Sequence, residues 1–66
     1  MTITLNGQKR ELPQAQPLSE LLDTLGLTGK PVVVEQNQMA LLPKEILTAQ
    51  VNDGDLIEIV QITAGG

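Results

Sequence analysis

Four leucines in the first half of the chain constrain its fold more than any other feature. They recur at spacings of three and four residues, which places them on one face of an amphipathic helix: Leu18, Leu21, Leu22 and Leu25. Gly26 follows and can take the left-handed conformation that ends a helix. A helix of about two and a half turns is unstable alone in water, so we expect its apolar face to pack against a sheet.

The segments around this helix carry strand and turn signals. Residues 2–5 alternate polar and apolar side chains, and Asn6-Gly7 favours a type I′ hairpin that returns through an edge strand at 8–12. The β-branched run 32–34 predicts an interior strand with both faces at least partly covered. Residues 39–42 then return as a short strand, and Pro17 suits the first position of the leucine helix.

The last strand is expected at residues 56–62, the most β-prone run in the chain. Because side chains alternate along a strand, Ile57 and Ile59 share one face, and Glu58, Val60 and Ile62 share the other. The face without a charge is the better core candidate. We therefore expect Glu58, Val60 and Ile62 to point outward as a docking patch, although single apolar residues are common on protein surfaces.

These elements predict an α+β roll, in which a mixed sheet of four or five strands packs on one main helix. Sixty-six residues provide only one hydrophobic core. We expect one domain at residues 1–62 and a flexible tail at residues 63–66. No long apolar segment or N-terminal leader is visible, which favours a cytoplasmic protein.

The composition excludes most catalytic chemistry, because the chain has no His, no Cys and no aromatic residue. Histidine acid–base catalysis, cysteine nucleophiles and the usual zinc ligand sets are thereby removed, as are stacking platforms for nucleic-acid bases. A net charge of −4 repels phosphate backbones and anionic lipid. We expect no catalytic residue, no bound metal or cofactor, and no nucleic-acid or membrane partner.

Two carboxylates in Asp53-Gly54-Asp55 raise the alternative of a cation site. A calcium loop needs more oxygen ligands at set spacings, and only Glu58 follows nearby. The segment is more typical of a tight surface turn in which glycine supplies the special backbone conformation.

The end of the chain, Thr63-Ala64-Gly65-Gly66, carries the most unusual chemical group. Two glycines have no Cβ, so the tail can pass through a channel that a larger side chain would block. A terminal carboxyl group has a pKa of roughly 3.5, so it is anionic at neutral pH and a poor electrophile until it is activated. The alternative is an ordinary frayed terminus.

Several of these features together resemble the ubiquitin-like sulfur carriers, in particular those of thiamin biosynthesis. The resemblance covers the whole chain and rests on the Asn6-Gly7 hairpin, the leucine helix, the segment 52–59 and the Ala64-Gly65-Gly66 end. Departures are Gln38, where glycine is common, and Lys44, where arginine is usual. The resemblance implies a β-grasp (ubiquitin-like) fold and a non-enzymatic carrier.

The resemblance also implies a mechanism and its partners. A ubiquitin-activating-like adenylyltransferase would use ATP and Mg to convert the Gly66 carboxylate into an acyl-adenylate. Sulfur from a persulfide enzyme would then displace AMP and leave a thiocarboxylate, which donates sulfur to thiazole synthase. Gly66 carries the sulfur, and the partners recognise Gly65, Ala64 and Thr63.

Three other functions stay open at this point. The small subunit of molybdopterin synthase carries sulfur for a different cofactor, and a ubiquitin-like modifier joins lysine amines through the same carboxyl end. The third is an interaction or scaffold domain whose Gly-Gly end is accidental.

Overall fold

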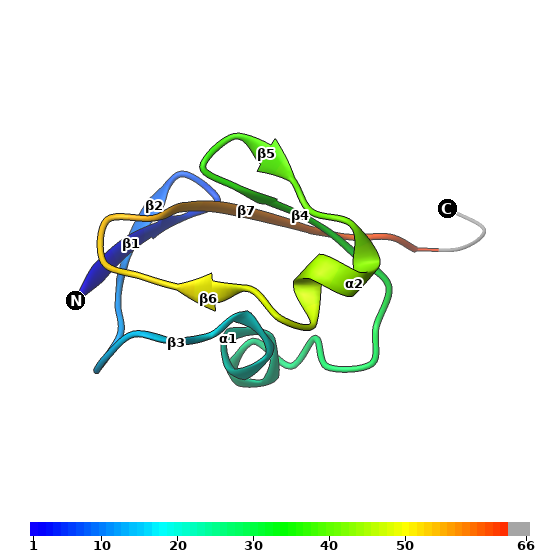
Figure 1. The fold of residues 1–66 in the computed structure, drawn as a ribbon, viewed down its shortest axis with the longest axis horizontal. Helices are drawn as coiled ribbons and strands as arrows, with labels where there is room; N and C mark the ends of the chain where they lie inside the picture. The colour runs from blue at the N-terminus through cyan, green and yellow to red at the C-terminus, as the bar shows by residue number, and fades with distance from the viewer. Residues whose placement is uncertain (64–66) are drawn as a thin grey trace.

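The computed structural model describes residues 1–63. Five strands form one sheet in the order β2-β1-β7-β4-β5, and two short strands, β3 and β6, form a separate ribbon (Figure 1). The elements are β1 (Thr2–Leu5), β2 (Gln8–Glu11), β3 (Gln16–Pro17), α1 (Leu18–Thr24), β4 (Val32–Gln36), β5 (Met39–Ala40), α2 (Pro43–Ile46), β6 (Gln50–Val51) and β7 (Leu56–Gln61).

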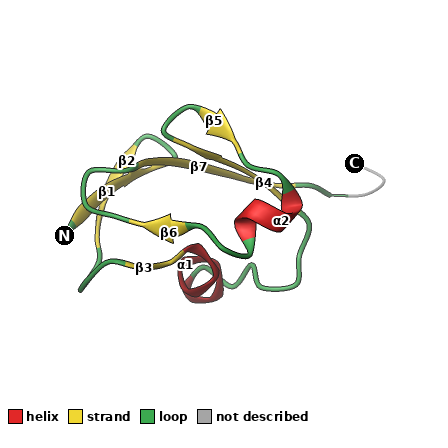
Figure 2. Cartoon of the chain, viewed as in Figure 1, coloured by secondary structure: helices red, strands yellow, loops and turns green. Residues whose placement is uncertain are grey.

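The sheet is mixed, as expected, because its central strand has neighbours of both orientations. β7 runs parallel to β1 and antiparallel to β4. Both helices and the β3–β6 ribbon lie on one side of the sheet, and its other side is open (Figure 2). This two-layer arrangement confirms the predicted α+β roll.

The two hairpins use the same turn chemistry with different residues. Asn6 (φ 51°) and Gly7 (φ 82°) both have positive φ, as a type I′ turn requires. The β4–β5 turn places Asn37 (φ 52°) and Gln38 (φ 69°) in the same region. Gln38 therefore holds a left-handed conformation in which its Cβ is unfavourable.

The leucine helix forms and ends as predicted. Leu18, Leu21 and Leu22 are buried. Gly26 (φ 74°) ends the helix, with its N–H donating to Asp23 O at 3.0 Å and Leu27 N–H donating to Leu22 O at 2.9 Å. These two bonds satisfy carbonyls that a helix terminus leaves unpaired.

The start of α1 differs from the prediction by one residue. Pro17 is the N-cap rather than the first helical residue, because it still lies in β3, opposite Gln50 of β6. Each of these strands has only two residues, too few to show an alternating pattern in the sequence.

The core lies between the sheet and α1, and aliphatic residues alone fill it: Ile3, Leu12, Leu18, Leu21, Leu22, Val34, Val51, Ile57 and Ile59. The inward orientation predicted for Ile57 and Ile59 is confirmed. The valine run forms the interior strand β4, as predicted. Val34 is fully buried, whereas Val33 on the other face is 47% exposed, because no second layer covers the open face of the sheet (Figure 2).

Candidate functional site

The central strand β7 leads directly into the C-terminal tail of the chain. Gln61 pairs with Val32 of β4, and the Ile62 N–H donates to Pro31 O at 2.9 Å. The strand β7 thus ends at Gln61, one residue earlier than predicted, although Ile62 still bonds to Pro31, the residue just before β4. Thr63 is exposed, and the expected sulfur-bearing and recognition residues Ala64, Gly65 and Gly66 lie outside the described residues.

Beside this exit, the open face of the sheet carries an apolar patch, which we define as Val33, Val60 and Ile62. Their exposed fractions are 47%, 62% and 51%, and Val33 lies directly opposite Val60 across the β4–β7 pair. The outward orientation expected for Val60 and Ile62 agrees with these exposures. Sequence reasoning missed Val33, although its alternation with buried Val34 would have placed it on the open face.

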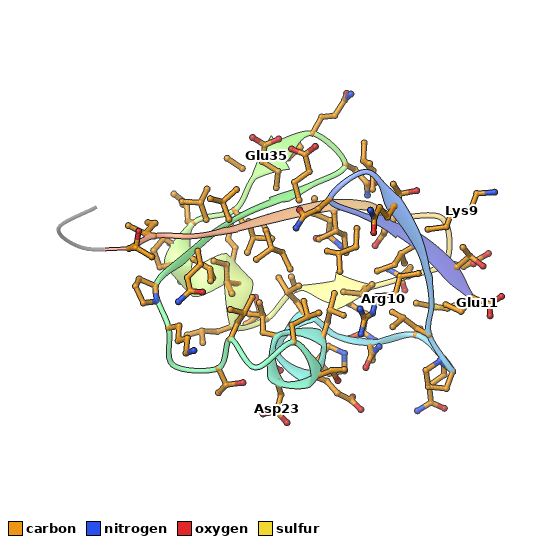
Figure 3. All side chains as sticks on the ribbon, turned by 180° about the vertical axis from the view of Figure 1, so that it is seen from behind. Lys9, Arg10, Glu11, Asp23 and Glu35 are labelled. Carbon is orange, nitrogen blue, oxygen red and sulfur yellow. The ribbon has the colours of Figure 1, made fainter. Side chains whose placement is uncertain are left out.

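Next along the same face, two carboxylates stand opposite each other. Glu58, predicted to point outward, is exposed and pairs across the strands with Glu35, which sequence reasoning also missed. Figure 3 shows Glu35 on the side of the sheet away from α1. Like charges directly opposite in a sheet are destabilising, so this pair does not serve the stability of the free domain.

On its other edge, β7 pairs with β1 at Leu56 and Ile57, and a side chain takes the place of the strand at Ile59. Asn6 Nδ2 donates to Ile59 O at 3.1 Å, and Ile59 N–H donates to Asn6 Oδ1 at 2.8 Å. The amide of Asn6 thus continues the β1 ladder past Leu5, where β1 ends. These bonds link positions 53 residues apart and fix the part of β7 that carries Val60.

The acidic turn is structural rather than a cation site. Asp55 accepts hydrogen bonds from Asn52 N–H at 2.9 Å, Gln36 Nε2 at 2.9 Å and Asn37 Nδ2 at 3.1 Å. Burial raises the pKa of Asp55, but the bonds from Asn52, Asn37 and Gln36 outweigh it and hold the pKa below its usual value. Within residues 1–63, no group of three or more acidic residues could hold a metal ion.

Comparison with known proteins identifies the family, because the model of the ThiS family matches residues 3–66. The chain belongs to the ThiS family. A sulfur carrier protein ThiS from Thermus thermophilus is 36% identical over 64 residues, which cover 97% of this chain and 98% of that protein. A thiamine biosynthesis protein (ThiS) from Geobacter metallireducens superposes over all of both chains with a TM-score of 0.82 and 29% identity.

A different kind of relative contains a similar segment within a longer protein. A thiazole synthase from Paramagnetospirillum magneticum is 36% identical over 67 residues, which cover all of this chain. The chain spans only 20% of that synthase. A ThiS-like segment therefore occurs in one polypeptide with a thiazole synthase.

These findings confirm the predicted resemblance to the sulfur carriers of thiamin biosynthesis and the β-grasp fold. They favour the thiamin branch over the molybdopterin-synthase alternative, because one ThiS relative is named a sulfur carrier protein and the other a thiamine biosynthesis protein. In the part of the chain that the structure describes, no helix is long and apolar enough to cross a membrane.

Proposed function

We propose that this protein carries sulfur on the carboxyl group of Gly66 and delivers it to thiazole synthase for the thiazole ring of thiamin. The observation that carries the proposal is the family match, which extends to residue 66 and therefore includes the Gly-Gly end. The geometry supports it, since β7 runs from the middle of the core to Thr63 beside an exposed apolar patch.

The chemistry requires an activating enzyme, because a carboxylate is a poor electrophile. A ubiquitin-activating-like adenylyltransferase, using ATP and Mg, joins the Gly66 carboxylate to AMP and releases pyrophosphate. The terminal sulfur of a persulfide on a sulfur-donating enzyme then attacks the acyl-adenylate and displaces AMP, which gives an acyl disulfide. Two electrons from thiols cleave the S–S bond of this acyl disulfide, which releases the thiocarboxylate and leaves the thiols oxidised to a disulfide. All catalytic groups belong to these partners, in keeping with a chain that has neither His nor Cys.

In this proposal the folded domain presents the tail to its partners. The apolar patch, with Glu58 beside it, docks on the enzymes, and Thr63, Ala64 and Gly65 lead Gly66 into their active sites. Glycine at positions 65 and 66 gives the tail a small cross-section. The ThiS-like segment within a thiazole synthase supports that enzyme as the acceptor of the sulfur.

Intact-mass analysis tests the proposal after coexpression with the adenylyltransferase and a sulfur source. The expected result is a mass increase equal to the replacement of one oxygen by sulfur at Gly66. A chain lacking Gly66 is the matched control, and it should keep its far-UV spectrum and melting temperature while gaining no sulfur. An unchanged mass for the full chain, with an adenylyltransferase that is active on another carrier, would refute the proposal.

A further inference from the structure

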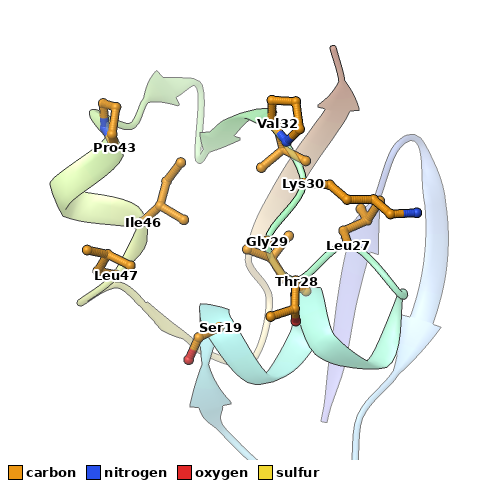
Figure 4. A pocket seen from close by; sticks show the side chains of 11 residues that line it. Ser19, Leu27, Thr28, Gly29, Lys30, Val32, Pro43, Ile46 and Leu47 are labelled. Carbon is orange, nitrogen blue, oxygen red and sulfur yellow. The ribbon is translucent and has the colours of Figure 1, made fainter. Parts of the chain in front are cut away.

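A pocket lies at the end of the molecule where the tail leaves. It has a volume of about 440 Å³ and opens between α1, α2 and the segment that leads from α1 to β4 (Figure 4). We call it the tail-end pocket. Its lining is largely apolar and includes Leu22, Leu27, Pro31, Val32, Ile46 and Leu47.

The lining shows what kind of group can enter. Buried Leu22 belongs to the core beneath the pocket, whereas Leu47, directly after α2, is 77% exposed. The Lys30 ammonium group points away from the pocket (Figure 4). An apolar group that enters would cover leucine and isoleucine side chains and meet no buried charge, so the pocket suits an aliphatic or aromatic side chain.

The position of Leu47 is fixed by the helix before it. Glu45 Oε1 accepts a hydrogen bond from Leu42 N–H at 2.7 Å, which closes the first turn of α2. Ala49 N–H donates to Glu45 O at 2.8 Å and holds the chain after the helix. These bonds hold Leu47 at the rim of the pocket, although a leucine gains nothing there in the free chain.

The reach of the tail links this pocket to the proposed chemistry. Gly66 lies three positions after Thr63, and even a fully extended chain of that length spans only about 10 Å. Ile62 bonds to Pro31, and Pro31 also lines the pocket. An enzyme that encloses Gly66 must therefore approach the surface around Pro31 closely enough to reach the pocket mouth.

We propose that thiazole synthase inserts an apolar side chain into the tail-end pocket when it takes the tail. This inference rests on the proposed function, and it names a second contact besides the open face of the sheet. Thiazole synthase is the partner chosen because a protein of that name contains a ThiS-like segment in its own chain. Such a contact fixes the direction in which the tail enters the enzyme.

The test measures the affinity of thiazole synthase for the full carrier by titration calorimetry. Leu47→Asp should weaken binding by about tenfold or more, because it places a charge on the apolar wall. Leu42→Asp is the matched control, since Leu42 directly precedes α2 and is 56% exposed but does not line the pocket. It should change the affinity by less than about threefold.

A second variant separates filling of the pocket from general charge effects. Ser19 is exposed on α1 and lines the pocket, so Ser19→Leu reduces the free volume while adding apolar surface. Weaker binding by this variant is expected if a side chain must enter, whereas general hydrophobic attraction would strengthen binding. The melting temperatures of Leu47→Asp and Ser19→Leu should equal that of the original chain.

The outcomes distinguish this inference from the proposed function. Affinities of Leu47→Asp and Ser19→Leu equal to that of the original chain would overturn the inference, as would an equal loss for Leu42→Asp. Failure of thiazole synthase to bind the original chain would also overturn it. The proposed function fails separately, if the original chain gains no sulfur in the intact-mass experiment.

Discussion

Replacing Asp55 with Asn should destabilise the fold far more than replacing its neighbour Asp53. The Asp55 carboxylate accepts three hydrogen bonds from donors in two segments: Gln36 and Asn37 at the end of β4, and Asn52 in the turn before β7. An amide of the same shape must turn its NH₂ group toward one of these donors. It therefore loses the charge and at least one bond, and leaves a donor unpaired in a site that is only 9% exposed.

The magnitude follows from the value of hydrogen bonds to charged groups, which is about 1.5–3 kcal/mol each and not strictly additive. We expect Asp55→Asn to cost about 2–4 kcal/mol. At about 0.05–0.15 kcal/mol per residue, a chain of 66 residues has a total stability of roughly 3–10 kcal/mol. The melting temperature should therefore fall by about 10 °C or more.

Stability should also depend on pH through this group. The folded-state pKa of Asp55 lies below the ordinary value of 3.8, so its contribution is complete above that value and is lost as pH falls through the folded-state pKa. The difference in unfolding free energy between the original chain and Asp55→Asn should thus be largest at neutral pH. It should shrink below about pH 4.

Urea unfolding at neutral and acidic pH checks both statements. Asp53→Asn is the matched control, because Asp53 is exposed and its Oδ1 accepts one bond from Thr2 N–H at 2.8 Å, which an amide oxygen can still accept. It should cost less than about 1 kcal/mol. Equal losses for the two variants, or a difference that grows in acid, would refute the reasoning.

Three further predictions concern the strands around the tail exit. Val60→Asp should weaken partner binding by about tenfold or more without lowering the melting temperature, because Val60 is 62% exposed; a large loss of stability would count against the docking role. Asn6→Gly keeps the positive φ but removes both bonds to Ile59, so urea unfolding should show a loss of about 1–3 kcal/mol, and none if the bonds are dispensable. Gln38→Gly should stabilise the fold by about 0.5–1 kcal/mol, because φ is 69°; a decrease would show that the Gln38 side chain contributes more than its strain costs.

The fold was predictable wherever a pattern extends over several residues. Asn6-Gly7 fixed the first hairpin, the leucine stripe fixed α1, and alternation in β7 separated Ile57 and Ile59 from their neighbours. The valine run correctly predicted an interior strand, but it did not show that Val33 is about half exposed and Val34 fully buried. The burial of a strand face depends on what other segments place over it, and a local pattern does not contain that information.

The roles of three polar residues could not be predicted. The sequence pattern placed Asn6 and Asp55 in turns, yet the Asn6 side chain pairs with the Ile59 backbone. Asn37 Oδ1 accepts a hydrogen bond from Leu56 N–H at 2.9 Å. Asn37 also donates to Asp55. These contacts join segments 18 to 53 residues apart, so no spacing rule shows them. The role of the tail stays a prediction, because it rests on the chemistry of residues that lie outside the described part of the chain.

The two faces of β7 have different roles: one packs in the core, and the other forms an exposed surface beside the tail. The inward residues Ile57 and Ile59 hold β7 in the core, while Glu58 between them and Val60 after them are exposed on the other face. If stability of the free chain alone had shaped this face, a neutral or oppositely charged pair would stand where Glu58 meets Glu35. The like-charged pair and the apolar patch beside it are both unfavourable in the free domain. Both features fit a surface that partners cover, beside the exit of the tail.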